Sequence, residues 1–234
     1  FLIGLVRTGF MRTIAIGDIH GCALALESVL NAIQPGVDDR LIFLGDYVDR
    51  GPDSRAVLEL IMETAYRCRV VPLLGNHELM LLAAFESVDF MPFWLQCGGQ
   101  ETVDSYGGNL DQVPAEHWEF LNQCRRFFET DSHLFFHANY DPTLSPAEQS
   151  DMLTLWQHLS QSVPGPHQSG KTVIVGHTPQ RTGEILDLGH LLCIDTACFA
   201  GGWLTAFDVN SKQVWQANRR GELRQGDANG SPNS

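Results

Sequence analysis

The segment Thr13-Ile14-Ala15-Ile16-Gly17-Asp18 decides the fold. A short run rich in β-branched residues predicts a buried strand, and the glycine allows a sharp turn into a carboxylate. The same order recurs twice, because residues 41–44 precede Gly45-Asp46 and residues 70–74 precede Gly75-Asn76. Three repeats of strand, glycine and polar loop predict the first half of a parallel sheet.

Helical patterns separate these strands and complete β-α-β units. Apolar residues recur at helical spacing over residues 24–33 and 57–61, between the first and second and the second and third strands. Later apolar runs predict strands at residues 134–136, 172–175, 191–194, 204–207 and 213–215. We therefore expect an α/β fold with two facing mixed β-sheets, a β-sandwich flanked by helices.

No linker divides the chain into two domains. Met11 opens the first strand pattern, so residues 1–10 are expected to be an upstream extension that is not native. Residues 11–218 are predicted to form a single domain with a helical insertion at about residues 79–126. Residues 219–234 are rich in Gly, Asn, Ser and Pro and predict a disordered tail.

Composition excludes several classes of protein. The 234 residues carry a formal net charge of −13, which argues against a broad basic surface for nucleic acid. No apolar run approaches the roughly 20 residues of a membrane span. The six cysteines form no C-x-x-C pair, so we expect free thiols and a cytoplasmic protein.

Ligand-type side chains follow five of the predicted strands. Strands of an open α/β sheet present their carboxyl ends at one edge, where ligands bind. Oxygen and imidazole groups without thiolate suit Mn²⁺, with Fe or Zn²⁺ as alternatives. The residues in these positions are Asp18, His20, Asp46, Asp49, Arg50, Asn76, His77, Glu78, His137 and His177.

These motifs resemble those of a known family. Residues 17–21 (GDIHG), 45–51 (GDYVDRG) and 75–78 (GNHE) are similar to the signature motifs of PPP-type serine/threonine phosphoprotein phosphatases. The resemblance is to the bacterial branch of the calcineurin-like metallophosphoesterases. The late segment at residues 201–206, with Asp195-Thr196 before it, also resembles bacterial diadenosine tetraphosphatases.

The resemblance implies the calcineurin-like fold and a site with two divalent metal ions. Asp18, His20 and the bridging Asp46 would hold the first ion, and Asp46, Asn76, His137 and His177 the second. It implies in-line attack on phosphorus by a hydroxide between the metals.

The same resemblance assigns roles to neighbouring side chains. Arg50 and Asn76 would bind the substrate phosphate. His77 would be the general acid that protonates the leaving oxygen, and Asp49 would orient it.

Two departures concern the phosphate contacts. Leu74 stands where eukaryotic-type protein phosphatases have an arginine, and residues 138–176 contain no arginine. Arg50 would therefore act alone or with Arg181 or His158.

The expected activity is hydrolysis of phosphomonoesters, with protein phosphoserine or phosphothreonine, and also phosphotyrosine, as substrates. A dinucleoside polyphosphate hydrolase is the alternative, and a non-catalytic scaffold of the same fold is the third. Phosphoproteins or small phosphoesters are the expected partners, without nucleic acid or membrane, and the oligomeric state is left open.

Overall fold

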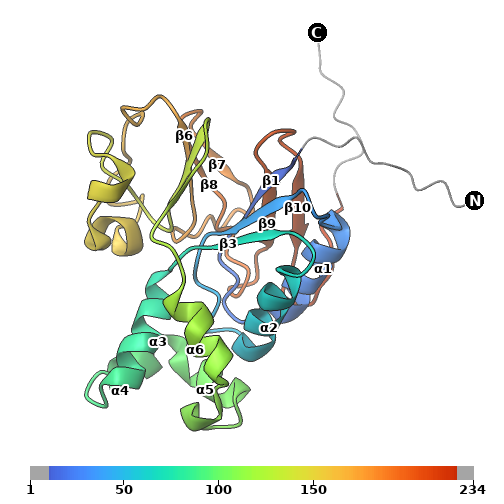
Figure 1. Cartoon of the computed structure of the whole chain (residues 1–234), viewed down its shortest axis with the longest axis vertical. Coiled ribbons are helices and arrows are strands. Elements are labelled where there is room, and N and C mark those ends of the chain that lie inside the picture. Colours follow the sequence, from blue (N-terminus) through green and yellow to red (C-terminus); the bar gives the residue numbers. More distant parts are fainter. Residues whose placement is uncertain (1–10, 226–234) are drawn as a thin grey trace, which may run out of the picture.

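In the computed structural model, which describes residues 11–225, ten strands form two mixed sheets (Figure 1). The first sheet has the order β10-β9-β1-β2-β3 and the second β4-β5-β6-β8-β7. The strands are β1 (Thr13–Ile16), β2 (Arg40–Phe43), β3 (Arg69–Pro72), β4 (Phe128–Glu129), β5 (His133–Phe135), β6 (Thr172–Val175), β7 (Leu186–Asp187), β8 (Leu191–Cys193), β9 (Leu204–Asp208) and β10 (Val214–Ala217).

Each sheet combines three parallel strands with two antiparallel strands, which lie together on one side of the first sheet and at the two edges of the second. β1, β2 and β3 pair in parallel, while β9 and β10 are antiparallel. In the second sheet β5, β6 and β8 are parallel, with β4 and β7 antiparallel at the two edges. The predicted α/β architecture of two facing mixed sheets flanked by helices is confirmed.

The buried apolar side chains form three clusters, and neighbouring residues of one strand belong to different clusters. In β1, Ala15 belongs to the cluster between the two sheets, together with Ile42 and Ile174. Its neighbours Ile14 and Ile16 belong to the cluster beneath the helices. Because successive side chains of a strand point to opposite faces, each central strand is buried on both sides.

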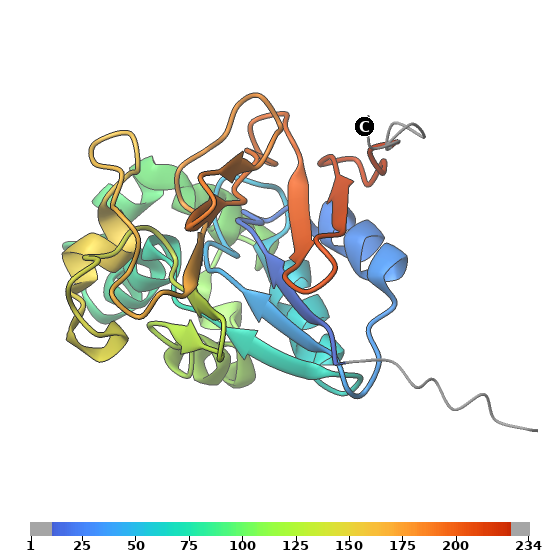
Figure 2. The same cartoon turned by 90° about the horizontal axis from the view of Figure 1, so that it is seen from above.

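Helices α1 (Ala23–Ile33) and α2 (Ser54–Thr64) cover the outer face of the first sheet. Figure 2 shows α1 lying outside β9 and β10, away from the second sheet. Over residues 11–225 the longest helices have 11 residues, and none is apolar and long enough to cross a membrane.

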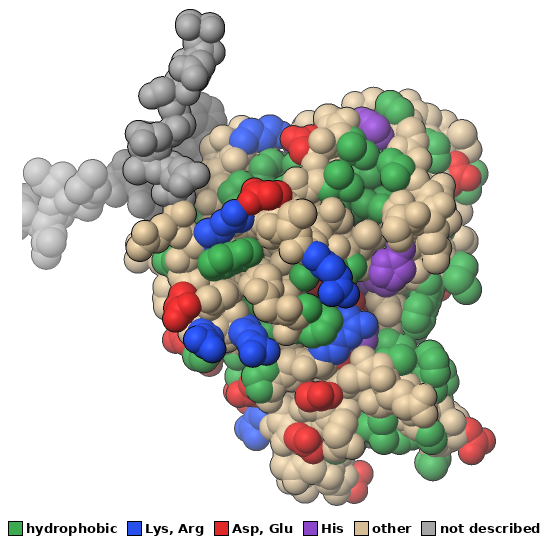
Figure 3. Space-filling model, turned by 180° about the vertical axis from the view of Figure 1, so that it is seen from behind, with side chains coloured by type: hydrophobic (Ala, Val, Ile, Leu, Met, Phe, Trp, Pro, Cys, Tyr) green, Lys and Arg blue, Asp and Glu red, His purple; other side chains and the backbone are tan. Residues whose placement is uncertain are grey.

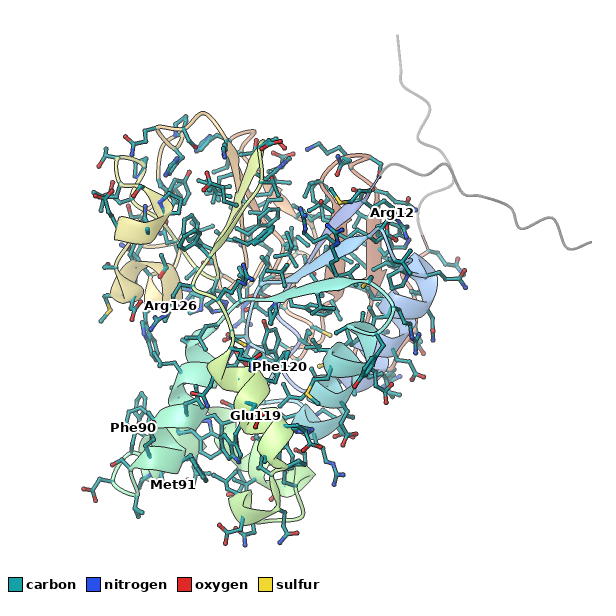
Figure 4. The ribbon with its side chains drawn as sticks, viewed as in Figure 1. Arg12, Phe90, Met91, Glu119, Phe120 and Arg126 are labelled. Atoms are coloured by element: carbon teal, nitrogen blue, oxygen red, sulfur yellow. The ribbon has the colours of Figure 1, made fainter. Side chains whose placement is uncertain are left out.

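A group of short helices lies between β3 and β4, where the sequence predicts a helical insertion over about residues 79–126. Figure 4 shows Phe120 of α6 near the first sheet, and Phe90 and Met91 at the far end of the group. The ring centroid of Phe120 lies 6.0 Å from that of Tyr47. These helical segments are α3 (Asn76–Glu86), α4 (Met91–Trp94), η1 (Leu95–Gly99), α5 (Gln100–Ser105), η2 (Leu110–Gln112) and α6 (Ala115–Asn122). Two further short turns, η3 (Pro146–Glu148) and η4 (Met152–Trp156), lie between β5 and β6.

The structure departs from the sequence-based expectations in two places. Strands β4 and β7 are not predicted, because edge strands of two residues carry no periodic pattern. Residues 219–225, expected to belong to a disordered tail, fold back on the first sheet, where Arg224 donates to Gln216 Oε1 (2.8 Å) and the Gly183 carbonyl (2.8 Å). The expectations for residues 1–10 and 226–234 lie outside the described residues.

Candidate metal centre

Five loops, each following the carboxyl end of a parallel strand, bring the candidate ligands together. Asp18 and His20 follow β1, Asp46 follows β2, and Asn76 begins α3 after β3. His137 and His177 follow β5 and β6 of the second sheet. All six residues are less than one-tenth exposed, so their ligand-type atoms have little contact with solvent.

Three histidines each bond a backbone carbonyl through one ring nitrogen. His20 Nδ1 lies 2.9 Å from Val48 O, His137 Nδ1 lies 2.8 Å from Leu44 O, and His177 Nε2 lies 3.2 Å from Trp156 O. A carbonyl only accepts, so each of these nitrogens carries the proton and the other presents a lone pair. Metal-bound histidines in proteins are oriented in this way.

The remaining nitrogens converge with oxygen acceptors. His137 Nε2 lies 3.1 Å from His177 Nδ1, 3.1 Å from Asn76 Oδ1 and 3.4 Å from Asp46 Oδ1. On the other side of the same carboxylate, Asp46 Oδ2 lies 3.4 Å from His20 Nε2. Lone pairs that face one another at these distances can together coordinate a cation. Two groups of three ligand-type residues result, and Asp46 belongs to both.

Burial and charge keep these groups in the form that binds metals. Burial lowers the pKa of His20 and His137, and lowers that of His177 to about 3, which favours the neutral imidazole that binds metals. Burial alone would raise the pKa of Asp46, but the surrounding histidines, His137 foremost, outweigh it and hold the pKa well below its usual range.

Asp18 lies beside this cluster but has a different contact. Both of its carboxylate oxygens accept the backbone N–H of His177 at 3.0 Å. Gly176 permits this approach, because a Cβ there would lie 2.1 Å from Asp18 Oδ1. Burial, followed by the charges of Asp195 and Asp46, raises the pKa of Asp18 well above its ordinary value. In the described residues Asp18 belongs to neither three-residue group of ligand atoms.

His77 differs from the other site histidines in its partner. Its Nδ1 lies 2.7 Å from Asp49 Oδ2, and both side chains are fully buried or nearly so. Burial lowers the pKa of His77, but the carboxylates of Asp46 and Asp49 outweigh it and leave the pKa raised. His77 also lies within reach of His20 and Asp46 as a ligand, but its raised pKa suits proton donation rather than metal binding.

Arg50 reaches the same site from the loop after β2. Its guanidinium lies over the ring of Phe199, 4.9 Å from the centroid, and Nη1 lies 3.0 Å from His20 Nε2. The side chain is exposed to solvent on its other side. A planar fork of donors at the mouth of the site is suited to phosphate oxygens.

Backbone strain is concentrated at the site. Eight non-glycine residues of the described chain have a positive φ, and five of them are candidate site residues: His20, Asp46, Asp49, Arg50 and His177. Each such residue costs about 1–3 kcal/mol and persists only where its surroundings enforce it.

Glu78 helps to enforce this conformation, a role that the motif did not suggest. Its buried carboxylate accepts N–H bonds from Asp46 (2.8 Å), Tyr47 (2.7 Å), Val48 (3.2 Å) and Gly75 (2.9 Å). Glu78 is the third residue of α3, and its bond to the N–H of the N-cap residue Gly75 is the half of a capping box that a glycine allows; a glutamate at this spacing is the signal for it in the sequence.

A pocket of about 570 Å³ opens over the ligand atoms. Arg50 and Arg181 both line it, although 131 positions separate them, and the side chains of Trp156, His158 and Phe199 form part of its wall. Figure 3 shows Lys or Arg and His side chains gathered near the middle of the back face. The pocket therefore combines cationic and aromatic surface in a chain of strongly negative net charge.

Comparison with known proteins identifies the family. Residues 11–202 match the calcineurin-like phosphoesterase family. The chain belongs to this family. The donor set described above fits the divalent metal ions that this family uses.

Two curated relatives of the chain carry the same name. A protein of Janthinobacterium sp. (strain Marseille), named a symmetrical bis(5'-nucleosyl)-tetraphosphatase, is 35% identical over 144 residues. This alignment covers 59% of the chain but 47% of the relative, so the chain spans about half of it. A protein of the same name from Salmonella paratyphi B is 27% identical over an alignment that covers 93% of the chain and 99% of the relative.

Solved structures share the fold. A crystal structure of a candidate diadenosine tetraphosphatase has a TM-score of 0.67 and 23% identity, covering 88% of this chain and 93% of that one. A cold-active protein tyrosine phosphatase has a TM-score of 0.65 and 17% identity, covering 92% of this chain and 78% of that one. At these identities the likeness shows the fold alone.

Proposed function

We propose that this metallophosphoesterase hydrolyses dinucleoside polyphosphates, with diadenosine tetraphosphate as the representative substrate. The observation that carries the proposal is the pocket, which places Arg50 and Arg181 beside the aromatic side chains of Trp156 and Phe199. A substrate with several adjacent phosphates and a nucleobase has partners for both. The names of the curated relatives point to the same substrate.

The metal-binding roles are part of this proposal. Asp18, His20 and Asp46 would hold one divalent ion, and Asp46, Asn76, His137 and His177 would hold a second. Mn²⁺ fits the oxygen and imidazole donors, with Fe or Zn²⁺ as alternatives. Bound divalent ions supply Lewis-acid stabilisation of phosphoryl oxygens and lower the pKa of water.

The chain's own residues supply proton transfer and orientation. Asp49 holds Nδ1 of His77, so that Nε2 is the nitrogen free to protonate the leaving phosphate oxygen as the P–O bond breaks. Arg50 and Arg181 hold neighbouring phosphates, and Asn76 contacts the phosphate that is attacked. No side-chain nucleophile is required, so no phosphoenzyme forms.

Substrate comparison tests the proposal. We expect a higher kcat/KM for diadenosine tetraphosphate than for a phosphoserine or phosphothreonine peptide, assayed with Mn²⁺ after chelation. Symmetrical cleavage gives two molecules of ADP, whereas asymmetrical cleavage gives AMP and ATP, and chromatography separates them. Efficient turnover of the phosphopeptide with none of the tetraphosphate would overturn the proposal in favour of a protein phosphatase.

Arg181 provides a second test. We expect R181A to raise KM for diadenosine tetraphosphate by about 10-fold or more, because a charge-assisted hydrogen bond is lost. Its KM for p-nitrophenyl phosphate, which has a single phosphate, should change little. The control is R220A, since Arg220 is exposed and lies outside the pocket. Equal effects on both substrates would mean that Arg181 does not contact a second phosphate.

A further inference from the structure

Two consecutive residues next to the metal centre adopt an unfavourable backbone conformation. Asp49 has a φ of 71° and Arg50 a φ of 68°, in the left-handed region that glycine favours. Asp49 bonds His77, the candidate general acid, and Arg50 carries the guanidinium that is the candidate phosphate-binding group. Something must therefore fix both residues in this conformation.

The helical insertion binds Asp49 at its backbone and at its carboxylate. Trp94 Nε1 donates to Asp49 Oδ2 (2.9 Å), the oxygen that also faces His77, and Thr102 Oγ1 donates to Oδ1 (2.7 Å). The same hydroxyl accepts the backbone N–H of Asp49 (2.9 Å) and a bond from Ser54 Oγ (2.8 Å). Trp94, Thr102 and Asp49 are each 0% exposed, so water cannot replace these bonds.

The same segment also fixes Arg50. The backbone N–H of Arg50 donates to the carbonyl of Gly98 (2.9 Å), within the irregular turn η1. A Cβ at Gly98 would lie 2.6 Å from Arg50 Cγ, and one at Gly99 would lie 2.4 Å from Trp94 Cε2. Close approach therefore favours glycine at both positions, and Gly98 also has a φ of 108°, which residues with a Cβ rarely adopt.

We infer that residues 94–102 of the helical insertion are a positioning element for the reaction, with Trp94 and Thr102 orienting the His77–Asp49 pair and Gly98 orienting Arg50. With a donor on each carboxylate oxygen, Asp49 keeps Oδ2 against His77 Nδ1, which leaves His77 Nε2 directed at the substrate pocket. The inference rests on the proposed proton-donor role of His77, but it does not depend on which phosphate ester is the substrate.

Leaving-group dependence tests the inference. We expect W94F and T102V each to lower kcat/KM about 10-fold for an alkyl phosphate, in line with the loss of partners that orient a catalytic group. For p-nitrophenyl phosphate, whose leaving group needs little protonation, the loss should be less than about 2-fold. G98A should lower both rates to a similar extent, because it displaces Arg50. Metal content should be unchanged in all three.

A control and an independent measurement make the outcome decisive. W118F alters another tryptophan of the insertion, which stacks on Phe85 away from the site, and should leave both rates unchanged. In the proton NMR spectrum, a downfield Nδ1–H signal of His77, assigned with H77N, should be present in the wild type and shifted or lost in T102V. This signal can be followed even if W94F does not fold.

Equal losses on the alkyl and nitrophenyl esters, with an unchanged His77 signal, would overturn the inference and leave Trp94 and Thr102 as packing residues. A wild-type protein that hydrolyses simple phosphate esters but not diadenosine tetraphosphate would instead contradict the proposed substrate and leave the positioning role intact.

Discussion

At the scale of single residues, the histidines of the site fall into two groups, according to whether one ring nitrogen bonds a backbone carbonyl or a carboxylate. His20, His137 and His177 donate to carbonyls and have lowered pKa values because they are buried. His77 donates to a carboxylate, and its pKa is raised. Four imidazoles in one buried site therefore have two kinds of chemistry, and the difference arises from which backbone or side-chain oxygen each one meets.

Leu74 shows how burial limits redesign of the phosphate contacts. Placing arginine here is attractive from the sequence, but Leu74 is 6% exposed and its backbone N–H bonds Arg125 O. We expect L74R to lower the free energy of unfolding by about 3 kcal/mol or more, because an unpaired charge would be buried. Urea unfolding measures this, with L74M as the control that keeps size and polarity.

The opposite outcome is also informative. If L74R kept wild-type stability and lowered KM for phosphate esters, the arginine would reach the pocket from this position, and the burial of Leu74 would be incidental.

At the scale of elements, loops between strands and helices are fixed by hydrogen bonds from side chains of neighbouring segments. Glu78 at the start of α3 bonds the loop after β2, and Trp94 and Thr102 of the insertion bond Asp49. Far from the site, Asp39 before β2 accepts from Arg12 Nε (3.0 Å) and from the N–H of Gly36 (2.8 Å), while Arg12 Nη1 also bonds the carbonyl of Ile33 at the end of α1.

The Arg12–Asp39 pair gives a stability that depends on pH. Burial raises the pKa of Asp39, but Arg12 and Gly36 outweigh it and leave the pKa lowered. A lowered carboxyl pKa stabilises the fold above the unfolded value of about 3.9, and the effect is lost as pH falls through the folded pKa. We expect D39N to be about 1 kcal/mol less stable than the wild type at pH 7, with the difference shrinking below about pH 4.

Urea unfolding at pH 7, 5 and 3 measures this difference. The matched control is D38N, because Asp38 is the exposed neighbour in the same loop. A gap between wild type and D39N that stays constant from pH 7 to pH 3 would show that the ionised carboxylate does not contribute.

At the scale of the whole molecule, the two sheets meet at the site and each supplies ligands. The first sheet contributes Asp18, His20, Asp46 and Asn76, and the second contributes His137 and His177. Ions held between them would join the sheets, so metal binding should stabilise the fold. Asp46 lies between both groups of ligand atoms and is the residue whose loss should affect this most.

We therefore expect Mn²⁺ to raise the Tm of the chelated protein. At a free concentration of 100 Kd the gain is about 2.7 kcal/mol, or roughly 5–10 °C for a chain of this size. Differential scanning calorimetry should show most of the shift lost in D46N and retained in H77N and D38N. A full shift in D46N would contradict the bridging role of Asp46.

Local patterns in the sequence were sufficient to predict the fold and the candidate ligands. The apolar runs followed by Gly-Asp or Gly-Asn predict the central strands and the loops after them, because burial and turn geometry depend on neighbouring residues. The motifs at residues 17–21, 45–51 and 75–78 predict which side chains lie at the strand ends. The structure confirms the two facing sheets, and one pocket is lined by residues of the second and third motifs, among them Asp46, Arg50, Asn76 and His77.

The tertiary structure alone decided how those side chains are held. Leu44 O orients His137, which lies 93 positions further along the chain, and Thr102 bonds Asp49 across 53 positions. Arg181, in the loop between β6 and β7, lines the same pocket as Arg50. Neither periodicity nor a motif marks such contacts, because they join segments that only the packing of the sheets and the insertion brings together. Trp94 illustrates the difference, because its indole N–H acquires a role only where the folded insertion meets Asp49.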